Sequence, residues 1–231
     1  MSWRTNSLIL KMRNLGRAIG VNRWIASWLQ GNGYEAKYDQ QFSGCIGSGD
    51  CVWDIGANIG YYTKLFAERV GKEGSVVSFE PSPVNFGRLV EQCASLKNVT
   101  LLQYGLGKSD GKIHFQQGKD ELGATSHVTH NNSSGVVVDI RSGDRLLAMG
   151  TVKAPNVIKM DVEGFEWDVL EGMNGLLKES YLRAIGIEVH FGILKEHGME
   201  RVPQQIEQLL RNSGFSCTWP DSSHLLAARI A

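Results

Sequence analysis

From residue 50 onward the sequence alternates short apolar strand patterns with amphipathic helical patterns, and this alternation limits the possible folds more than any other feature. Alternating strands and helices build a mostly parallel, doubly wound α/β sheet with helices on both faces. A turn at Asp221-Ser222-Ser223 separates the last two strand patterns and predicts a C-terminal antiparallel hairpin. The expected strands are Cys51–Asp54, Ser75–Phe79, Val99–Tyr104, Asn156–Met160, Arg183–Val189, Phe215–Trp219 and His224–Ile230, and the expected helices are Tyr61–Val70, 82 to about 96, Phe165–Met173 and Pro203–Asn212.

The region between the third and fourth strands has a different character. Lys112–Phe115 and Val136–Ile140 favour a hairpin, and residues 118–135 between them are rich in small polar side chains around His127 and His130. This stretch is interpreted either as a lid over an acceptor site or as a solvated surface loop.

The N-terminal part is expected to be a helical extension over residues 1–49, followed by the main domain over residues 50–231. Helical periodicity runs through residues 6–30 with a break at Gly20. Basic residues but no acidic ones precede Glu35, namely Arg4, Lys11, Arg13, Arg17 and Arg23. The segment is interpreted as a helical cap on the main domain, as a basic amphipathic helix for a membrane surface or a partner protein, or as a transit peptide.

Composition excludes several classes of protein. The chain has 24 Lys and Arg against 24 Asp and Glu, so it offers no basic field for nucleic acid. Its four cysteines form no CxxC pair, which indicates reduced thiols and a cytoplasmic protein. No apolar run approaches the roughly 18–20 residues that span a bilayer.

The turn after the first strand predicts a ligand site, because such sheets bind ligands beyond the carboxyl ends of their strands. Gly56 and Gly60 permit close backbone approach, but they lack the middle glycine of the dinucleotide pattern G-x-G-x-x-G. Amides near Tyr61–Thr63 can bind a carboxylate, and Asp54 or nearby carbonyl groups can bind an ammonium. Glu80, which ends the second strand, can accept both hydroxyls of a ribose. These features favour S-adenosylmethionine over NAD.

Three motifs in order resemble the FkbM family of S-adenosylmethionine-dependent methyltransferases: Asp54-Ile-Gly-Ala-Asn-Ile-Gly60, Ser78-Phe-Glu-Pro-Ser-Pro83 and Ile158-Lys-Met-Asp-Val-Glu-Gly-Phe-Glu166. The resemblance covers roughly residues 50–195. It implies a class I methyltransferase (Rossmann-like) fold of seven strands, S-adenosyl-L-methionine as the cofactor, and hydroxyl groups of sugars, glycolipids or secondary metabolites as acceptors. The cofactor-binding residues that follow from the residues and the resemblance together are Asp54, Gly56, Ala57, Asn58, Gly60, Tyr61 and Thr63 at the methionine end, Glu80, Pro81 and Ser82 near the ribose, Gly105 and Leu106 near the adenine, and Asp161.

Methyl transfer to an alcohol also requires a base, and the fourth and fifth strands end in ionisable residues. Lys159 and Asp161 can share one face of their strand, and Glu188 and His190 can share one face of theirs. These four are the candidate catalytic residues. His190 is interpreted as the base through a near-neutral imidazole, or else as a structural histidine. A Lys159–Glu188 ion pair is the structural alternative for those two residues, and Asp161 either faces the sulfonium, orients the acceptor or caps the next helix.

Asp161, Glu188 and His190 would also form a ligand set for a divalent ion, but no spacing demands one and we expect no metal. Glu163 and Glu166 have less defined roles, and Glu166 suits the first turn of a helix.

The expected function is therefore an S-adenosylmethionine-dependent O-methyltransferase for a small-molecule or glycan acceptor that contains a sugar or is a secondary metabolite. The alternatives are a catalytically silent S-adenosylmethionine-binding partner module and an NAD-dependent oxidoreductase. An amine acceptor is disfavoured, because Asp161-Val-Glu-Gly stands where Asn-Pro-Pro-Tyr would follow the fourth strand.

Overall fold

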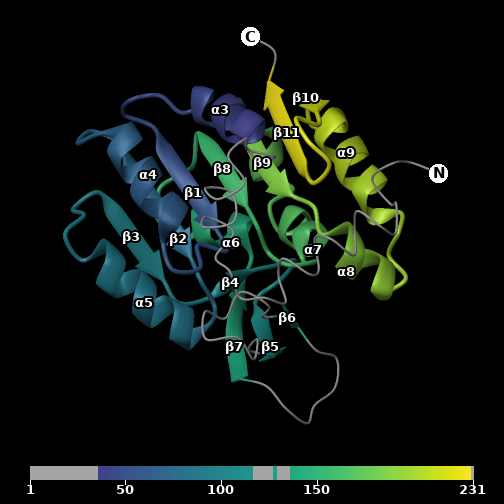
Figure 1. Cartoon of the computed structure of the whole chain (residues 1–231), viewed down its shortest axis with the longest axis horizontal. Coiled ribbons are helices and arrows are strands. Elements are labelled where there is room, and N and C mark those ends of the chain that lie inside the picture. The colour runs from purple at the N-terminus through teal and green to yellow at the C-terminus, as the bar shows by residue number, and fades with distance from the viewer. Residues whose placement is uncertain (1–35, 117–126, 129–135, 230–231) are drawn as a thin grey trace.

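Within residues 36–116, 127–128 and 136–229, which the computed structural model describes, a seven-stranded sheet forms the centre of the protein (Figure 1). Five neighbouring strands are parallel, and next to them one strand runs antiparallel both to the fifth of these and to the last strand at that edge. The predicted doubly wound sheet with a C-terminal antiparallel hairpin is confirmed. In spatial order the strands are β10 (Phe215–Thr218), β11 (His224–Arg229), β9 (Ala184–Glu188), β8 (Val157–Met160), β1 (Cys51–Ile55), β2 (Ser75–Phe79) and β3 (Val99–Leu102).

Helices cover both faces of this sheet, which is why its central strands β1, β8 and β9 are buried along their whole length rather than on alternate residues. Cys51 and Trp53 pack into one core cluster, whereas Val52, between them, packs into another on the opposite face. In Figure 1 α4 and α5 lie over β1, β2 and β3. The longer helices are α4 (Tyr61–Val70), α5 (Pro83–Cys93) and α9 (Val202–Asn212), and α7 (Glu166–Glu171) is shorter.

Local sequence explains where these helices begin. Ser82 caps α5 by accepting a hydrogen bond from the backbone N–H of Asn85 at 3.4 Å, and Pro83 occupies the first helical position. The helix ends at Cys93, earlier than the predicted end near residue 96.

A further helix, α3 (Ala36–Gly44), packs on the face that α4 covers. Its Tyr38 and Phe42 are buried against Val52 and Phe66. A side chain at Gly186, in the middle of β9, would overlap the hydroxyl of Tyr38 and the ring of Phe42. The glycine therefore makes room for α3 directly on the sheet. The division of the chain at residues 49 and 50 stays a prediction.

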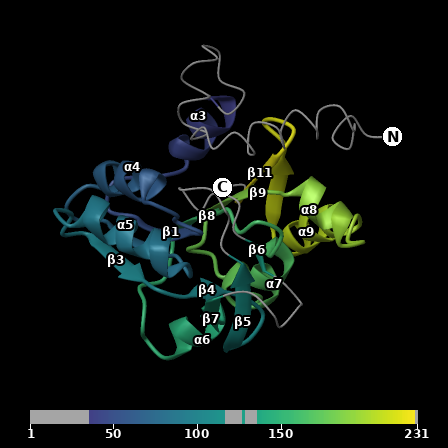
Figure 2. The same cartoon turned by 60° about the horizontal axis from the view of Figure 1, so that its bottom comes forward.

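A second, smaller sheet is formed by the part of the chain between β3 and β8, which includes the region expected to form a hairpin. Figure 2 shows it at the lower side of the molecule. The expected third strand stops at Leu102, and Gly105 starts a new strand in this second sheet. The expected loop at 118–135 contains a short strand paired with β5. The strands are, in order, β4 (Gly105–Leu106), β7 (Val136–Arg141), β5 (Gly111–Gln116) and β6 (His127–Val128).

Three short helices were not predicted: α6 (Gly143–Ala148), the 3-10 helix η2 (Leu176–Lys178) and α8 (Phe191–Glu196). Each has six residues or fewer, too few for a helical period to be recognised in the sequence. The predicted helices in residues 6–30 and most of the 118–135 loop lie outside the described residues. Across the described part of the chain, no helix is long and apolar enough to cross a membrane.

Candidate functional site

The order of the strands reverses between β1 and β8, and the segments that follow these two strands touch. From β1 the sheet continues through β2 to β3 on one side, and from β8 to β9 on the other. Gly56 has a φ of 79°, and a side chain there would overlap the carbonyl oxygen of Asp161. The Asp161 amide donates to the Ile55 carbonyl at 3.0 Å. Doubly wound sheets bind ligands at this reversal point, so the predicted glycine turn and Asp161 are adjoining parts of one site.

Glu80 connects the glycine turn to the end of β2. Its Oε2 accepts from the backbone N–H of Asn58 at 2.8 Å, and its Oε1 accepts from that of Ser82 at 2.8 Å. Burial raises the pKa of Glu80 to about 7, because the two N–H groups offset only part of the desolvation. A carboxylate has about four acceptor positions, so Glu80 can also accept from ligand hydroxyls.

The methionine side of the predicted site contains a helix start and two buried oxygens. Helix α4 follows Gly60, which offers no side chain to cap it, so its first amides can bind a carboxylate. Thr63 donates to Asp54 Oδ2 at 2.6 Å, and burial raises the pKa of Asp54. Asp54 Oδ1 and Asn58 Oδ1 are buried without a hydrogen-bond partner among the residues that the structure describes. These oxygens and amides fit the ammonium and carboxylate of an amino-acid ligand.

The predicted adenine side lies where the two sheets meet. Gly105 starts β4, and a side chain there would lie 2.8 Å from Ile140 and 3.6 Å from Pro81. Gly105 therefore leaves room for Ile140 and lies beside Pro81. Leu106 is buried in the main core.

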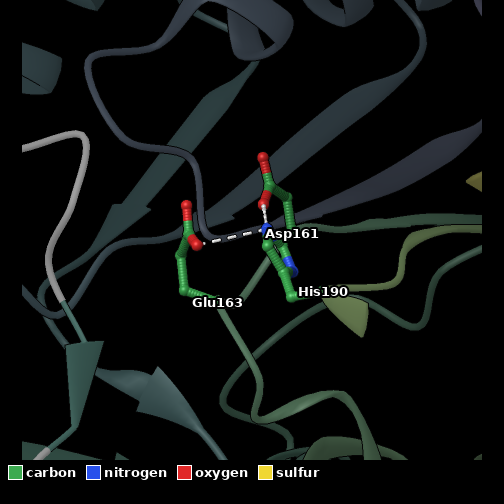
Figure 3. A group of neighbouring side chains, drawn as sticks. All are labelled: Asp161, Glu163 and His190. Atoms are coloured by element: carbon green, nitrogen blue, oxygen red, sulfur yellow. Dashed lines mark ion pairs between the residues drawn. The ribbon is translucent and has the colours of Figure 1, made fainter. Parts of the chain in front are cut away.

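Carboxylates surround the buried imidazole of His190, which follows β9. Its Nδ1 lies 2.6 Å from Glu166 Oε1. Its Nε2 lies 3.2 Å from Glu163 Oε2 and 3.4 Å from Asp161 Oδ1, and both side chains converge on the ring in Figure 3. Glu188 Oε1 follows at 3.9 Å. Burial lowers the pKa of His190, but these carboxylates outweigh it and raise the pKa to about 9. The expected near-neutral imidazole is therefore wrong, because the surrounding charge favours the imidazolium.

Lys159 has partners other than the predicted one. Its Nζ lies 3.5 Å from Asp161 Oδ2 and 3.9 Å from Asp54 Oδ1. Asp54 is its register neighbour on β1, whereas its neighbour on β9 is Gly186. The expected Lys159–Glu188 pair is therefore replaced by pairs with Asp54 and Asp161. In the register Lys159 stands beside Gly186, and Glu188 lies two residues further along β9.

A second buried histidine, His224 at the start of β11, was missed. Its Nε2 lies 3.8 Å from Glu188 Oε2, and its Nδ1 lies 2.8 Å from Asp221 Oδ2. Burial opposes ionisation of Asp221, but the hydrogen bonds from His224 and from backbone N–H groups outweigh it and lower the pKa of Asp221. Tyr38 stacks on His224 with ring centroids 4.1 Å apart. The predicted hairpin could have placed His224 beside Glu188, because an antiparallel β11 must begin where β9 ends.

The structure thus brings the candidate catalytic residues together with the glycine turn, although their roles stay predictions. Asp161, Glu163 and His190 also form a group that could hold a metal ion.

Comparison with known proteins identifies a family. The model of the methyltransferase FkbM domain matches residues 54–217. A hexuronic acid methyltransferase of Haloferax volcanii is 34% identical over 145 residues, which are 62% of this chain and 57% of that protein. A methyltransferase of Sordaria araneosa is 26% identical over 222 residues, with 77% of this chain and 80% of that protein covered. The chain thus spans little more than half the length of the first of these relatives.

Solved structures confirm the class I methyltransferase fold. A Clostridium thermocellum protein that has been proposed to be an rRNA methylase has a TM-score of 0.52 at 12% identity, with 87% of this chain and 97% of that chain covered. A Streptococcus mutans protein assigned as a methyltransferase, in complex with S-adenosylhomocysteine, has a TM-score of 0.51 at 10% identity, covering 84% of this chain and 96% of that chain.

Proposed function

We propose that this chain, which belongs to the FkbM methyltransferase family, transfers a methyl group from S-adenosylmethionine to a hydroxyl of a sugar-containing or secondary-metabolite acceptor. The family uses S-adenosylmethionine as its methyl donor. The observation that carries the proposal is the contact between Gly56 and the Asp161 carbonyl, which sets a cofactor-type turn directly against a cluster of carboxylates and an imidazole. A hydroxyl acceptor needs such a cluster because it must lose a proton.

The residues around the glycine turn fit the cofactor. Glu80 accepts the ribose hydroxyls while it holds the amides of Asn58 and Ser82 in place. The first amides of α4 bind the carboxylate, and the oxygens of Asp54 and Asn58 face the ammonium. When bound, the cofactor supplies a methyl carbon on a sulfonium, and its transfer to the acceptor oxygen leaves the carbon–sulfur electron pair on sulfur as a thioether.

The residues at the carboxyl ends of β8 and β9 handle the acceptor. Asp161, which like Glu163 is partly exposed, orients the hydroxyl, while Lys159 holds Asp161 and Asp54 in place at 3.5 and 3.9 Å. Glu188 and His190 provide the negative charge and the fixed ring around it, and a carboxylate of the cluster takes the hydroxyl proton. Holding donor and acceptor in attack geometry supplies much of the remaining acceleration.

The sugar acceptor is supported by one relative, whose name gives hexuronic acid as its substrate class. Small-molecule or glycan acceptors therefore come first in a screen, and nucleic acid is not among the expected partners. A cytoplasmic location stays a prediction.

The test is turnover by the purified full chain, with methyl-labelled S-adenosylmethionine and a panel of methyl glycosides, hexuronic acids and polyketide alcohols. We expect label in an ether that survives mild alkali. Label that alkali removes would indicate a methyl ester and refute the hydroxyl assignment. Cofactor binding without turnover of any acceptor would instead favour the silent partner module.

The variant His190→Gln separates chemistry from binding. We expect it to reduce turnover by about 10²-fold, because the carboxylates lose the buried imidazolium that fixes their positions, while the affinity for S-adenosylhomocysteine stays unchanged. Glu171→Gln is the matched control, because Glu171 is an acid on α7 that pairs with the exposed Lys108 at 3.1 Å, away from the cluster. Equal turnover in both variants would contradict a role for His190.

A further inference from the structure

We propose that Asp161, Glu163 and His190 form a binding site for a divalent cation. Each offers one ligand atom, and the three atoms lie within 4.8 Å of one another. Figure 3 shows both carboxylates directed toward the same edge of the imidazole. Two carboxylate oxygens and one imidazole nitrogen suit Mn²⁺, Zn²⁺ or, with added waters, Mg²⁺.

The two distances from His190 Nε2 to the carboxylates have values that fit a shared cation. Ligand atoms about 2.1 Å from one ion are about 3.0–3.4 Å apart when they subtend octahedral to tetrahedral angles. His190 Nε2 lies 3.2 Å from Glu163 Oε2 and 3.4 Å from Asp161 Oδ1. A small shift of the side chains would therefore complete the coordination.

The ring of His190 is held in the orientation of a metal ligand. Its Nδ1 is 2.6 Å from Glu166 Oε1, and the Glu166 side chain is fully buried and also accepts from the Gly164 amide at 3.1 Å. The second ring N–H of a metal-binding histidine commonly donates a hydrogen bond to such a carboxylate, which fixes the tautomer. The Nε2 atom is buried, points toward the two carboxylates, and has no hydrogen-bond partner within the described ranges.

The backbone brings Glu163 back toward this ring. Glu163 has a φ of 49°, in the left-handed region that few residues other than glycine adopt, and Gly164 follows with a φ of 99°. The turn thereby places Asp161 and Glu163, two residues apart, on the same side of His190.

The role of the cation rests on the proposed function. A hydroxyl bound to it has a lowered pKa, and the oxygen becomes the nucleophile when its proton leaves. The proton passes to Glu188, a cluster carboxylate that is not one of the three ligands and lies 3.9 Å from His190. The oxygen then bonds to the methyl carbon as the carbon–sulfur bond breaks.

The test is calorimetric titration of Mn²⁺, Zn²⁺ and Mg²⁺ into the chelator-treated full chain without cofactor or acceptor. We expect one site per chain for at least one of these ions. With Mn²⁺, pulsed electron paramagnetic resonance should detect the nitrogen of a coordinated imidazole, and His190→Gln should abolish that signal. Because no methyl transfer is measured, the outcome is independent of the proposed function.

The variants locate the site. Glu163→Gln should raise the Kd for the ion at least tenfold while leaving the affinity for S-adenosylhomocysteine unchanged, and Glu166→Gln should raise it about 10–100-fold. Glu171→Gln should bind the ion as the wild type does. Absence of binding for all three ions, or an equal Kd in wild type, Glu163→Gln and His190→Gln, would overturn the proposal.

Discussion

The affinity for the cofactor should depend on pH through Glu80. Burial raises the pKa of this carboxyl to about 7, with the charge of Asp54 adding to the effect and that of Lys159 opposing it. Both oxygens already accept backbone N–H groups, so only the ionised form can accept two ribose hydroxyls as well. If Glu80 were protonated, its own O–H would be a further donor beside the two backbone N–H groups and the two ribose hydroxyls. Ligand binding therefore favours ionisation, and affinity should fall as pH falls below 7.

The size of the effect follows from linkage. If the bound ligand returns the pKa of Glu80 from about 7 to its ordinary 4.5, the Kd rises by up to tenfold for each pH unit lost below 7. Between pH 8 and pH 5.5 the expected increase is about 30-fold, which corresponds to about 2 kcal/mol. In the free protein the sign is the opposite. The raised pKa means that the folded state holds the proton more tightly, so this group's contribution to stability is lost as pH rises from 4.5 through 7.

The assay is calorimetric titration of S-adenosylhomocysteine at half-unit steps from pH 5.5 to 8, because this ligand does not titrate there. Glu80→Gln, checked for folding by a thermal melt, should bind more weakly at pH 8 and show a flatter profile. A 2′,3′-dideoxy analogue separates ribose binding from support of the turn, since it should bind wild type and variant equally. Equal losses for both ligands in the variant, or parallel pH profiles in wild type and variant, would refute the ribose assignment.

Three further outcomes test the packing of the site. Gly56→Ala should lower stability by at least about 3 kcal/mol, a fall in Tm of about 6–12 °C, because its φ is positive and its side chain would overlap Asp161. Gly87→Ala, in the interior of α5 with nothing within 4 Å, should instead raise stability by about 0.5–1 kcal/mol, and a lower Tm would show that helix propensity does not control that position. Asp221→Asn should cost about 1–3 kcal/mol in urea unfolding at pH 7, because the charge-assisted bond to His224 is lost, and unchanged stability would contradict that bond.

The glycine turn and its contacts with the end of β2 could be predicted because their signals are local. A glycine turn after a strand, an acid at the end of the next strand, and a serine-proline helix start are each encoded within a few neighbouring residues. The order of the strands then brings Gly56 and Glu80 together without further information.

The acceptor half depends on register and on distant segments, which no local pattern encodes. The partner of Lys159 is decided by which residue of β1 stands beside it. The environment of His190 depends on a left-handed turn at Glu163. Nothing in the sequence distinguishes this turn from an ordinary segment that precedes a helix. His224 reaches Glu188 only because an antiparallel strand inserts beside β9. The charge around the histidine was therefore underestimated, and with it the pKa.

The absence of a side chain at Gly186 has a consequence for exchanging parts between relatives. Because Tyr38 and Phe42 occupy that space, and Tyr38 also stacks on His224, a chimera joined at the start of β1 would carry a sheet from one parent and an unmatched helix from the other. If β9 came from a parent with a larger residue at position 186, α3 of the other parent could not pack on the sheet. If α3 came from a parent with smaller side chains at positions 38 and 42, a cavity would form beside Gly186 and His224. Functional recombination should therefore succeed when α3 and β9 are inherited as a pair, however far apart they lie in the chain.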